Sequence, residues 1–220
     1  MRLVLFLLLT AAARAVDGPA VPDLPQLPAL SPAEALAAFQ MSPGFTISAA
    51  AVEPQVVDPV ALSFDDRGAL YVAEMRDYSE RRDEKLSRIR KLVDRDGDGV
   101  FESATVFMEG LAWATSVCWH QGVVYVAASP DLWRLRDADG DGMAEVQEKI
   151  FTGFGDGTAR LNVQALVNSL TPGPDGRIYG TAAANGGVVR RPDAPAGSGV
   201  SVRGRDFSFD PDTLYFRAEP

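Results

Sequence analysis

The chain has 220 residues, of which 46% are hydrophobic, so it is long enough to bury a core and does not have the composition of a disordered protein. Its formal net charge of -9 argues against a nucleic-acid partner, because nucleic-acid binding requires a basic surface. The single cysteine, Cys118, excludes an internal disulfide, and its apolar neighbours in TSVCW are typical of core packing.

The N-terminus predicts a secretory signal peptide over residues 1–15. Arg2 is followed by an apolar run at 3–13, and the small residues Ala13 and Ala15 predict cleavage after Ala15. An uncleaved anchor is the alternative, although the run is short for a membrane span. We therefore expect an exported protein that is periplasmic, at the cell surface or secreted.

Residues 16–30 contain four prolines at a spacing that predicts an extended linker. The sequence SPAE then predicts a short helix over about 32–39. Ser31 is the expected N-cap, Pro32 suits the first helical position, and Glu34 completes a capping box.

From residue 45 onward, short β-branched and aromatic runs alternate with Gly, Asp and Pro, which predicts strands and turns. Three of these segments share one pattern, an apolar strand, a turn and a strand containing tyrosine: ALSFDDRGALYVAE, SVCWHQGVVYVAA and SLTPGPDGRIYGTA. Their tyrosines, Tyr71, Tyr125 and Tyr179, are 54 residues apart in both intervals. Further strand candidates lie between the segments, so each period supplies about four strands, as in one blade of a β-propeller.

We therefore predict an all-β fold, a partial β-propeller of about three four-stranded blades, over residues 31–220, with a two-sheet sandwich as the alternative. Propellers have about four to eight blades. We accordingly expect this chain to be the N-terminal part of a longer protein that is interrupted within its third blade.

Two acidic loops, DRDGDGVFE and DADGDGMAE, resemble the calcium loop of an EF-hand. Their carboxylates stand at loop positions 1, 3, 5 and 9, and a glycine follows at the sharp turn. An oxygen-only ligand set favours a hard cation such as calcium, and a metal-free acidic turn is the alternative. The candidate metal ligands are Asp94, Asp96, Asp98 and Glu102 in the first loop, and Asp137, Asp139, Asp141 and Glu145 in the second.

The expected strand order separates these loops from the candidate ligand site. The acidic loops join third and fourth strands, whereas the second-to-third and blade-to-blade connections lie on the opposite face of a propeller. We therefore expect the acidic loops to be structural. The candidate cofactor- or substrate-binding residues on the other face are Asp58, Glu74, Arg76, Asp77, Tyr78, Trp113, Asp131, Asn162, Gln164, Asn168 and Asn185. Asp58 and Asn168 have the alternative role of hydrogen-bonding strand ends.

Several stretches, including SPAEALAAFQMSPGFTI, KLVDRDGDGVFESATVFMEGL, LRDADGDGMAEVQEKIFTGFG and NVQALVNSLTPGPDGRIYG, are similar to those of the exported membrane-bound dehydrogenase family of PVC-type bacteria. The resemblance covers nearly all of residues 31–220. It implies a six-bladed propeller similar to quinoprotein glucose/sorbosone dehydrogenases. Many members of that family carry a C-terminal cytochrome c domain with a CxxCH heme site. This sequence has no CxxCH, so we expect no heme in this region.

The resemblance implies hydride transfer from a sugar or other alcohol to pyrroloquinoline quinone, with a cytochrome c domain or protein as electron acceptor. Enzymes of this type use a histidine as base, but the only histidine, His120, falls in a turn on the opposite face, so we expect the base to lie beyond Pro220. The alternative is a carboxylate such as Glu74 or Asp77, which would need a raised pKa to serve as the base. The alternative is a non-catalytic, calcium-stabilised propeller that binds carbohydrate or a protein partner.

Overall fold

A computed structural model describes residues 28–157, 160–195 and 198–220, so the predicted signal peptide and most of the linker lie outside the described residues. The chain divides into two compact units, residues 1–40 and 41–220. The described part of the first unit contains α1 (Pro32–Ala37). Its capping box is confirmed, because Glu34 N–H donates to Ser31 Oγ (3.3 Å) and Ser31 N–H donates to Glu34 Oε2 (2.8 Å). The helix ends at Ala37, two residues before its predicted end.

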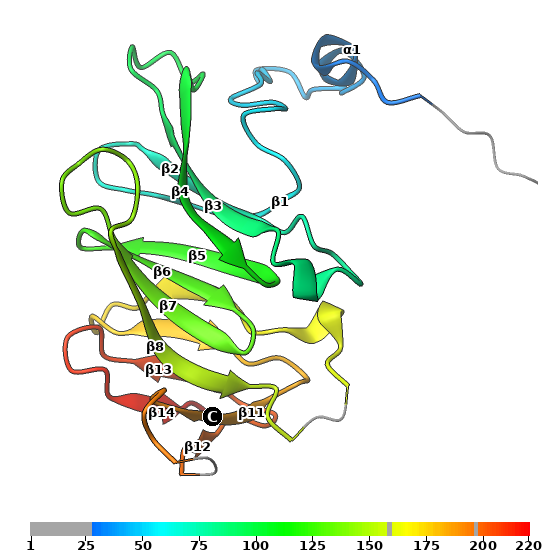
Figure 1. The fold of residues 1–220 in the computed structure, drawn as a ribbon. Coiled ribbons are helices and arrows are strands. Elements are labelled where there is room, and N and C mark those ends of the chain that lie inside the picture. The colour runs from blue at the N-terminus through cyan, green and yellow to red at the C-terminus, as the bar shows by residue number, and fades with distance from the viewer. Residues whose placement is uncertain (1–27, 158–159, 196–197) are drawn as a thin grey trace, which may run out of the picture. The chain divides into compact units, whose positions relative to one another are not determined.

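The second unit is built from three antiparallel sheets that lie side by side as the blades of a partial β-propeller (Figure 1). Blade 1 contains β1 (Pro59–Phe64), β2 (Leu70–Glu74), β3 (Ser87–Val93) and β4 (Ser103–Leu111). Blade 2 contains β5 (Ala114–His120), β6 (Val123–Ala128), β7 (Asp131–Arg136) and β8 (Val146–Phe154). Blade 3 contains β9 (Asn168–Pro172), β10 (Ile178–Thr181), β13 (Asp206–Phe209) and β14 (Phe216–Ala218). The predicted four-stranded repeat is therefore confirmed.

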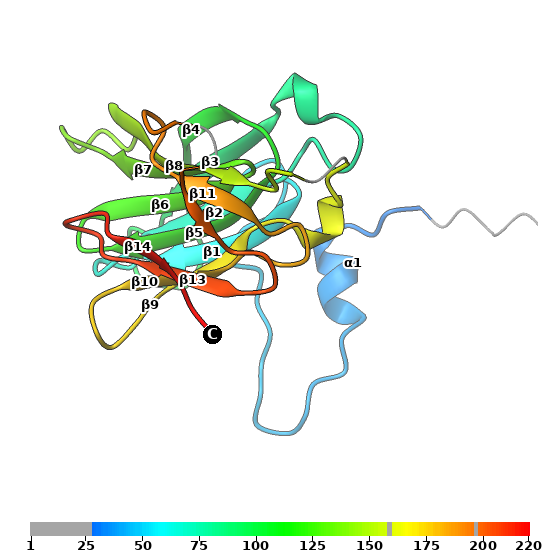
Figure 2. The ribbon, with the colours of Figure 1, turned by 90° about the horizontal axis from the view of Figure 1, so that it is seen from below.

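The three repeat tyrosines occupy the same place in the second strand of each blade. Tyr71 pairs with Ser63, Tyr125 with Cys118 and Tyr179 with Thr171. The first strands of the blades, β1, β5 and β9, contact one another in that order (Figure 2).

Blade 3 differs from the prediction in its second-to-third connection. The sequence predicts that the chain passes from β10 through Ala182–Gly187 into the third strand of the same blade. Instead, β11 (Gly187–Arg190) pairs with β8 at the outer edge of blade 2 and forms a hairpin with β12 (Val200–Ser201). This pairing requires glycine: a Cβ on Gly187 would lie 2.1 Å from the carbonyl oxygen of Gly153. The sequence period does not reveal this hairpin, because its strand pairs with the preceding blade and not with blade 3.

The core lies between blades rather than within them. Tyr71, Ile89 and Phe107 of blade 1 pack against Val117 and Val126 of blade 2. A second cluster joins blades 2 and 3 around a chain of contacting rings, in which Phe216 connects the rings of Tyr125, Phe151 and Phe209 to those of Phe154 and Phe207. Complete burial of a side chain of this size contributes about 1.5–3 kcal/mol, so blade packing is a major source of stability. Among the described residues, no helix is both long and apolar enough to cross a membrane.

Candidate functional site

Antiparallel strands place the connections of the blades at two opposite ends. The ligand face carries the second-to-third connections and the blade-to-blade connections, which include the 3₁₀ turns η1 (Arg82–Glu84) and η2 (Val163–Ala165). The turn face carries the acidic loops at 94–102 and 137–145, which join third to fourth strands as the sequence predicts. Figure 1 shows η1 and η2 at one end of the strands and the acidic loops at the other.

A cavity of about 760 Å³, called the large cavity below, opens on the ligand face above blade 2. It is lined by Ser79, Glu80, Arg82, Trp113, Pro130, Phe154, Gly155, Asp156, Gly157, Arg160, Leu161, Asn162 and Val163. Trp113 and Asn162 were candidates from the sequence. Arg82 and Arg160 were not, although Arg82 lies in the same EMRDYSERRDE connection that supplied four candidates.

Arg82 is held in place by the cavity wall. Its guanidinium lies 5.2 Å from the centroid of the Trp113 ring, and its Nη2 donates to the backbone oxygen of Ser129 (3.2 Å). Its Nε is buried and has no hydrogen-bond partner within the described part of the chain. A buried donor without a partner costs about 1–3 kcal/mol, so this N–H is suited to an acceptor supplied by a ligand or by water.

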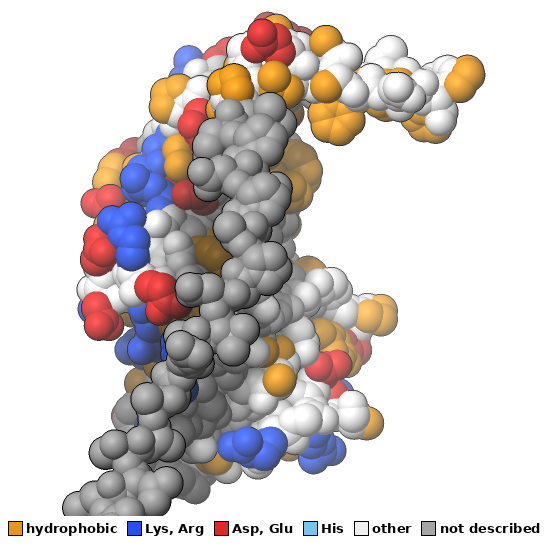
Figure 3. All heavy atoms as spheres, turned by 90° about the vertical axis from the view of Figure 1, so that its right-hand side faces the viewer, with side chains coloured by type: hydrophobic (Ala, Val, Ile, Leu, Met, Phe, Trp, Pro, Cys, Tyr) orange, Lys and Arg blue, Asp and Glu red, His pale blue; other side chains and the backbone are white. Residues whose placement is uncertain are grey.

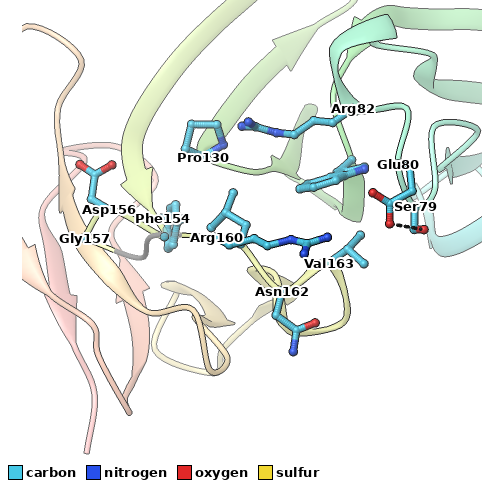
Figure 4. A pocket seen from close by; sticks show the side chains of 13 residues that line it. Ser79, Glu80, Arg82, Pro130, Phe154, Asp156, Gly157, Arg160, Asn162 and Val163 are labelled. Carbon is cyan, nitrogen blue, oxygen red and sulfur yellow. Dashed lines mark hydrogen bonds between the residues drawn. The ribbon is translucent and has the colours of Figure 1, made fainter. Parts of the chain in front are cut away.

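Arg160 supplies a second guanidinium to the same cavity. Figure 4 shows Arg82 extending toward Pro130 and Arg160 extending toward Val163. The two acidic lining residues differ in their partners. Asp156 forms an ion pair with Arg190 (2.6 Å), whereas Glu80 accepts a hydrogen bond from the Ser79 hydroxyl (3.3 Å). The cavity therefore offers cationic donors for an anionic group beside one carboxylate, that of Glu80, which has no ion pair among the described residues. Charges of both signs are interleaved on the visible part of this side of the molecule (Figure 3).

Two further cavities on this unit hold other predicted residues. One of about 520 Å³ runs along β1, β5 and β9 and is lined in part by Gln164 and Asn168. Another of about 440 Å³ is lined by Asp58 and Tyr78 together with Pro59, Val60 and Met75. The Asn168 amide donates to Leu166 O (2.9 Å), so it also fulfils the alternative role of supporting a strand end.

Glu74 and Asp77 are directed into the protein rather than into a cavity. Both are fully buried. Glu74 accepts a hydrogen bond from Val57 N–H (2.8 Å) and pairs with Arg88. Asp77 accepts a hydrogen bond from Trp113 N–H (3.0 Å) and another from the Ser87 hydroxyl. Their oxygens are engaged, so the structure does not support either residue as the base of a reaction in the large cavity.

Asp131 and Asn185 also have internal partners. Asp131 accepts a hydrogen bond from the Thr152 hydroxyl (2.6 Å) and pairs with Lys149 (2.7 Å). The Asn185 amide is buried and exchanges two hydrogen bonds with the backbone of Asn162 (2.8 and 3.0 Å), which fixes the wall of the large cavity. Arg76 is exposed. Charged and amide residues in these connections thus either hydrogen-bond within the protein or line a cavity, and local sequence cannot distinguish the two roles.

The two acidic loops have the same internal hydrogen bonds. In the first, Asp94 accepts hydrogen bonds from Gly97 N–H (2.7 Å) and Gly99 N–H (2.9 Å), and Glu102 accepts one from Arg95 N–H (2.8 Å). The bonds from Gly99 and Gly97 hold the pKa of Asp94 below its usual value. In each loop, one oxygen from each of the four predicted ligands lies within 4.8 Å of the others, which is compatible with one cation.

The second acidic loop is attached to the neighbouring blade. Lys91 pairs with Asp137 (3.0 Å), the Thr105 hydroxyl donates to Gly142 O (3.1 Å), and Ala144 N–H donates to Phe107 O (2.9 Å). Burial raises the pKa of Asp137, but the hydrogen bonds from Lys91 and from the loop backbone outweigh it and lower the pKa. These contacts link blade 2 to blade 1 on the turn face, away from the large cavity.

One of the comparisons with known proteins supports this architecture. The model of a family described as "Domain of unknown function (DUF7133)" matches residues 31–220. No curated protein matches the chain significantly. Among solved structures, the holo form of a pyranose dehydrogenase PQQ domain from Coprinopsis cinerea is similar over 80% of this chain and 38% of its own, with a TM-score of 0.55 and 16% identity. A putative oxidoreductase from Thermus thermophilus, described as a glucose dehydrogenase, is similar over 70% of this chain and 58% of its own, with a TM-score of 0.42 and 16% identity.

The chain thus spans less than two thirds of either solved relative. At this identity, the first likeness establishes the fold and leaves the activity to be argued from the site.

Proposed function

Since the chain belongs to the DUF7133 family, whose description leaves its activity open, we propose from the site that it forms part of a quinone-dependent sugar or alcohol dehydrogenase. The large cavity on the ligand face would hold the cofactor. The observation that carries the proposal is Arg82, fixed against Trp113 and Ser129, with its buried Nε lacking a partner among the residues described.

The lining residues fit pyrroloquinoline quinone in charge and size. This quinone is planar and carries carboxylates, and arginine is the side chain whose planar fork matches a carboxylate best. Arg82 and Arg160 would bind the carboxylates, and a cavity of about 760 Å³ accommodates a ligand of this size. When bound, the quinone supplies a two-electron acceptor for hydride from a carbinol carbon.

Glu80 is the side chain in this lining best suited to take the hydroxyl proton of a substrate. It is exposed and accepts a hydrogen bond from the Ser79 hydroxyl, whereas Asp156 is neutralised by Arg190. A general base needs to lie within hydrogen-bond reach of the proton it removes, which an exposed residue on a connection can achieve. The exposed Asn162 at the same wall would orient substrate hydroxyls.

A non-catalytic carbohydrate-binding propeller is the second candidate. It is favoured by the position of His120, which lies on the turn face and not at the cavity. An aromatic residue beside polar groups, as at Trp113, also suits a sugar ring without any cofactor.

Calcium forms part of the proposal as a structural ion in the acidic loops. With free calcium at about ten times its dissociation constant, each site would add about 1.4 kcal/mol to the free energy of unfolding.

The direct test has two measurements on the purified protein. The first is quinone binding, monitored by tryptophan fluorescence, and the second is reduction of a dye in the presence of each of a panel of sugars and alcohols. We expect saturable binding that Arg82→Gln weakens by about tenfold or more, whereas Arg76→Gln, an exposed arginine of the same connection, leaves it unchanged. Glu80→Gln should abolish dye reduction and preserve quinone binding. Sugar binding without quinone binding would instead support the second candidate.

A further inference from the structure

A smaller cavity, about 210 Å³, lies on the turn face between blades 2 and 3. It is bounded by the end of β5, by β6 and β7 and by the connection between β13 and β14. Its lining residues are His120, Gln121, Val123, Tyr125, Arg134, Arg136, Pro211 and Asp212. Neither the acidic loops nor the cavity of the ligand face contributes a residue to it.

His120 lines this cavity and has an unsatisfied polar atom in its imidazole. Its Nε2 is buried and has no hydrogen-bond partner among residues 28–157, 160–195 and 198–220. A buried polar atom left in this state costs about 1–3 kcal/mol, which a bound acceptor or donor would recover.

The other polar lining groups are mostly donors. Burial raises the pKa of Tyr125 to about 12, so its hydroxyl stays protonated at neutral pH. Arg134 directs Nε and Nη2 to Glu148. Arg136 is exposed and has no ion pair within the described ranges, and Asp212 is the only acidic residue of the lining.

We propose that this cavity binds a small oxyanion, held by His120, Tyr125 and Arg136. The shared chemistry is that of a carboxylate or a phosphate: a compact group with several acceptor oxygens, which matches N–H and O–H donors that line one cavity. In a chain with a net charge of -9, a cavity lined by two arginines and one acidic residue is a local excess of positive charge that favours an anion. The proposal is independent of the quinone site, which lies on the opposite face.

The single histidine of the sequence provides a direct readout. We would titrate the ¹³C-labelled protein with sodium acetate and, separately, with sodium phosphate, at constant pH and constant ionic strength maintained with sodium chloride, and follow the imidazole resonances of His120. A saturable shift is expected with one or both anions. Comparison of the two titrations identifies whether carboxylate or phosphate is preferred.

Two variants test whether the donors act together. Arg136→Gln should weaken binding by about tenfold or more, as expected for losing a hydrogen bond to a charged group. Tyr125→Phe should also weaken anion binding, although it keeps the aromatic ring, whose centroid lies 5.4 Å from that of Phe209. Arg67→Gln, at an exposed arginine in the turn between β1 and β2, is the matched control and should leave binding unchanged. A shift that does not saturate, or one that Arg136→Gln leaves intact, would overturn the proposal in favour of a water-filled cavity.

Discussion

Leu62 and Val117 occupy equivalent positions on the first strands of neighbouring blades, yet their exposure differs completely. Leu62 pairs with Val72, and Val117 pairs with Val126, the equivalent residue one repeat later. The Leu62 residue is 62% exposed, whereas Val117 is 3% exposed because blade 1 covers it. The difference in exposure arises because a preceding blade covers β5 and none covers β1 among the described residues; it does not arise from the strands themselves.

This relationship predicts unequal costs for truncating the two side chains. Val117→Ala should lower the free energy of unfolding by about 2 kcal/mol, because it removes two buried carbons and leaves a cavity. Leu62→Ala should change it by less than about 0.5 kcal/mol, as expected at an exposed position. Urea denaturation of both variants measures the difference, and equal costs would mean that the face of β1 is covered in solution.

Replacing Asp77 should destabilise the protein more than replacing its neighbour Arg76. Asp77→Ala leaves Trp113 N–H and the Ser87 hydroxyl without their acceptor in a buried site, at a cost of about 3 kcal/mol. Arg76→Ala, at an exposed position, should be close to neutral. Thermal unfolding of the pair provides the measurement, and a neutral Asp77→Ala would indicate a ligand-binding role rather than a structural one.

The pairing of β8 with β11 depends on the close approach at Gly187. A Cβ there would collide with backbone atoms, whereas Gly176, which also has a positive φ (+78°), has nothing within 4 Å. Gly176→Ala should therefore cost only the strain of a left-handed residue, about 1–2 kcal/mol. Gly187→Ala should cost more and should increase amide hydrogen exchange in β11. Similar exchange in both variants would show that the hairpin does not pair with blade 2.

The thiol of Cys118 should be unreactive in the folded protein. Burial raises its pKa from the ordinary 9.0 to about 12, so almost no thiolate is present near neutral pH. Because the folded pKa is the higher one, the associated stability is fully present below pH 9 and is lost as the pH rises toward 12. Thiol labelling should follow unfolding, and Cys118→Ala should show a smaller loss of stability over this interval. Rapid labelling of the native protein would contradict the burial.

Calcium should raise the melting temperature, and a chelator should reverse the effect. Asp98→Asn and Asp141→Asn each remove one ligand charge from a different loop, so each should reduce the calcium response by part of its total. Asp66→Asn, at an exposed residue of the turn between β1 and β2, is a control outside both loops. An unchanged melting temperature with calcium, together with no heat of binding by calorimetry, would exclude the sites.

The sequence predicted the repeated part of this fold well because the repeat is local. Alternating apolar residues and the regular tyrosines follow from strand geometry, so the strands of blades 1 and 2 and the position of both acidic loops could be derived without a structure. The insertion of β11 and β12 was missed because its pairing partner, β8, belongs to the preceding blade.

The candidate site was only partly accessible to the same reasoning. Strand alternation placed the second-to-third and blade-to-blade connections at the same end of the blades, as the structure does, and Trp113 and Asn162 line the cavity of about 760 Å³ there. It could not tell that Glu74 and Asp77 turn inward, because their partners Arg88 and Ser87 follow only after the intervening connection has folded back. Nor could it select Arg82 over Arg76, since both are arginines in one charged segment.

The sequence by itself thus determined the strand period, the acidic loops and the face on which each connection lies, since all of these depend on residues near one another in the chain. Only the tertiary structure decided which charged side chains satisfy buried donors and which line a cavity. That choice depends on burial, and burial is created by the packing of one blade against the next. Arg82 and Asp77 lie five positions apart in one connection, and both contact Trp113. Arg82 lies over the Trp113 ring and lines the cavity, whereas Asp77 is buried and accepts a hydrogen bond from the Trp113 backbone N–H.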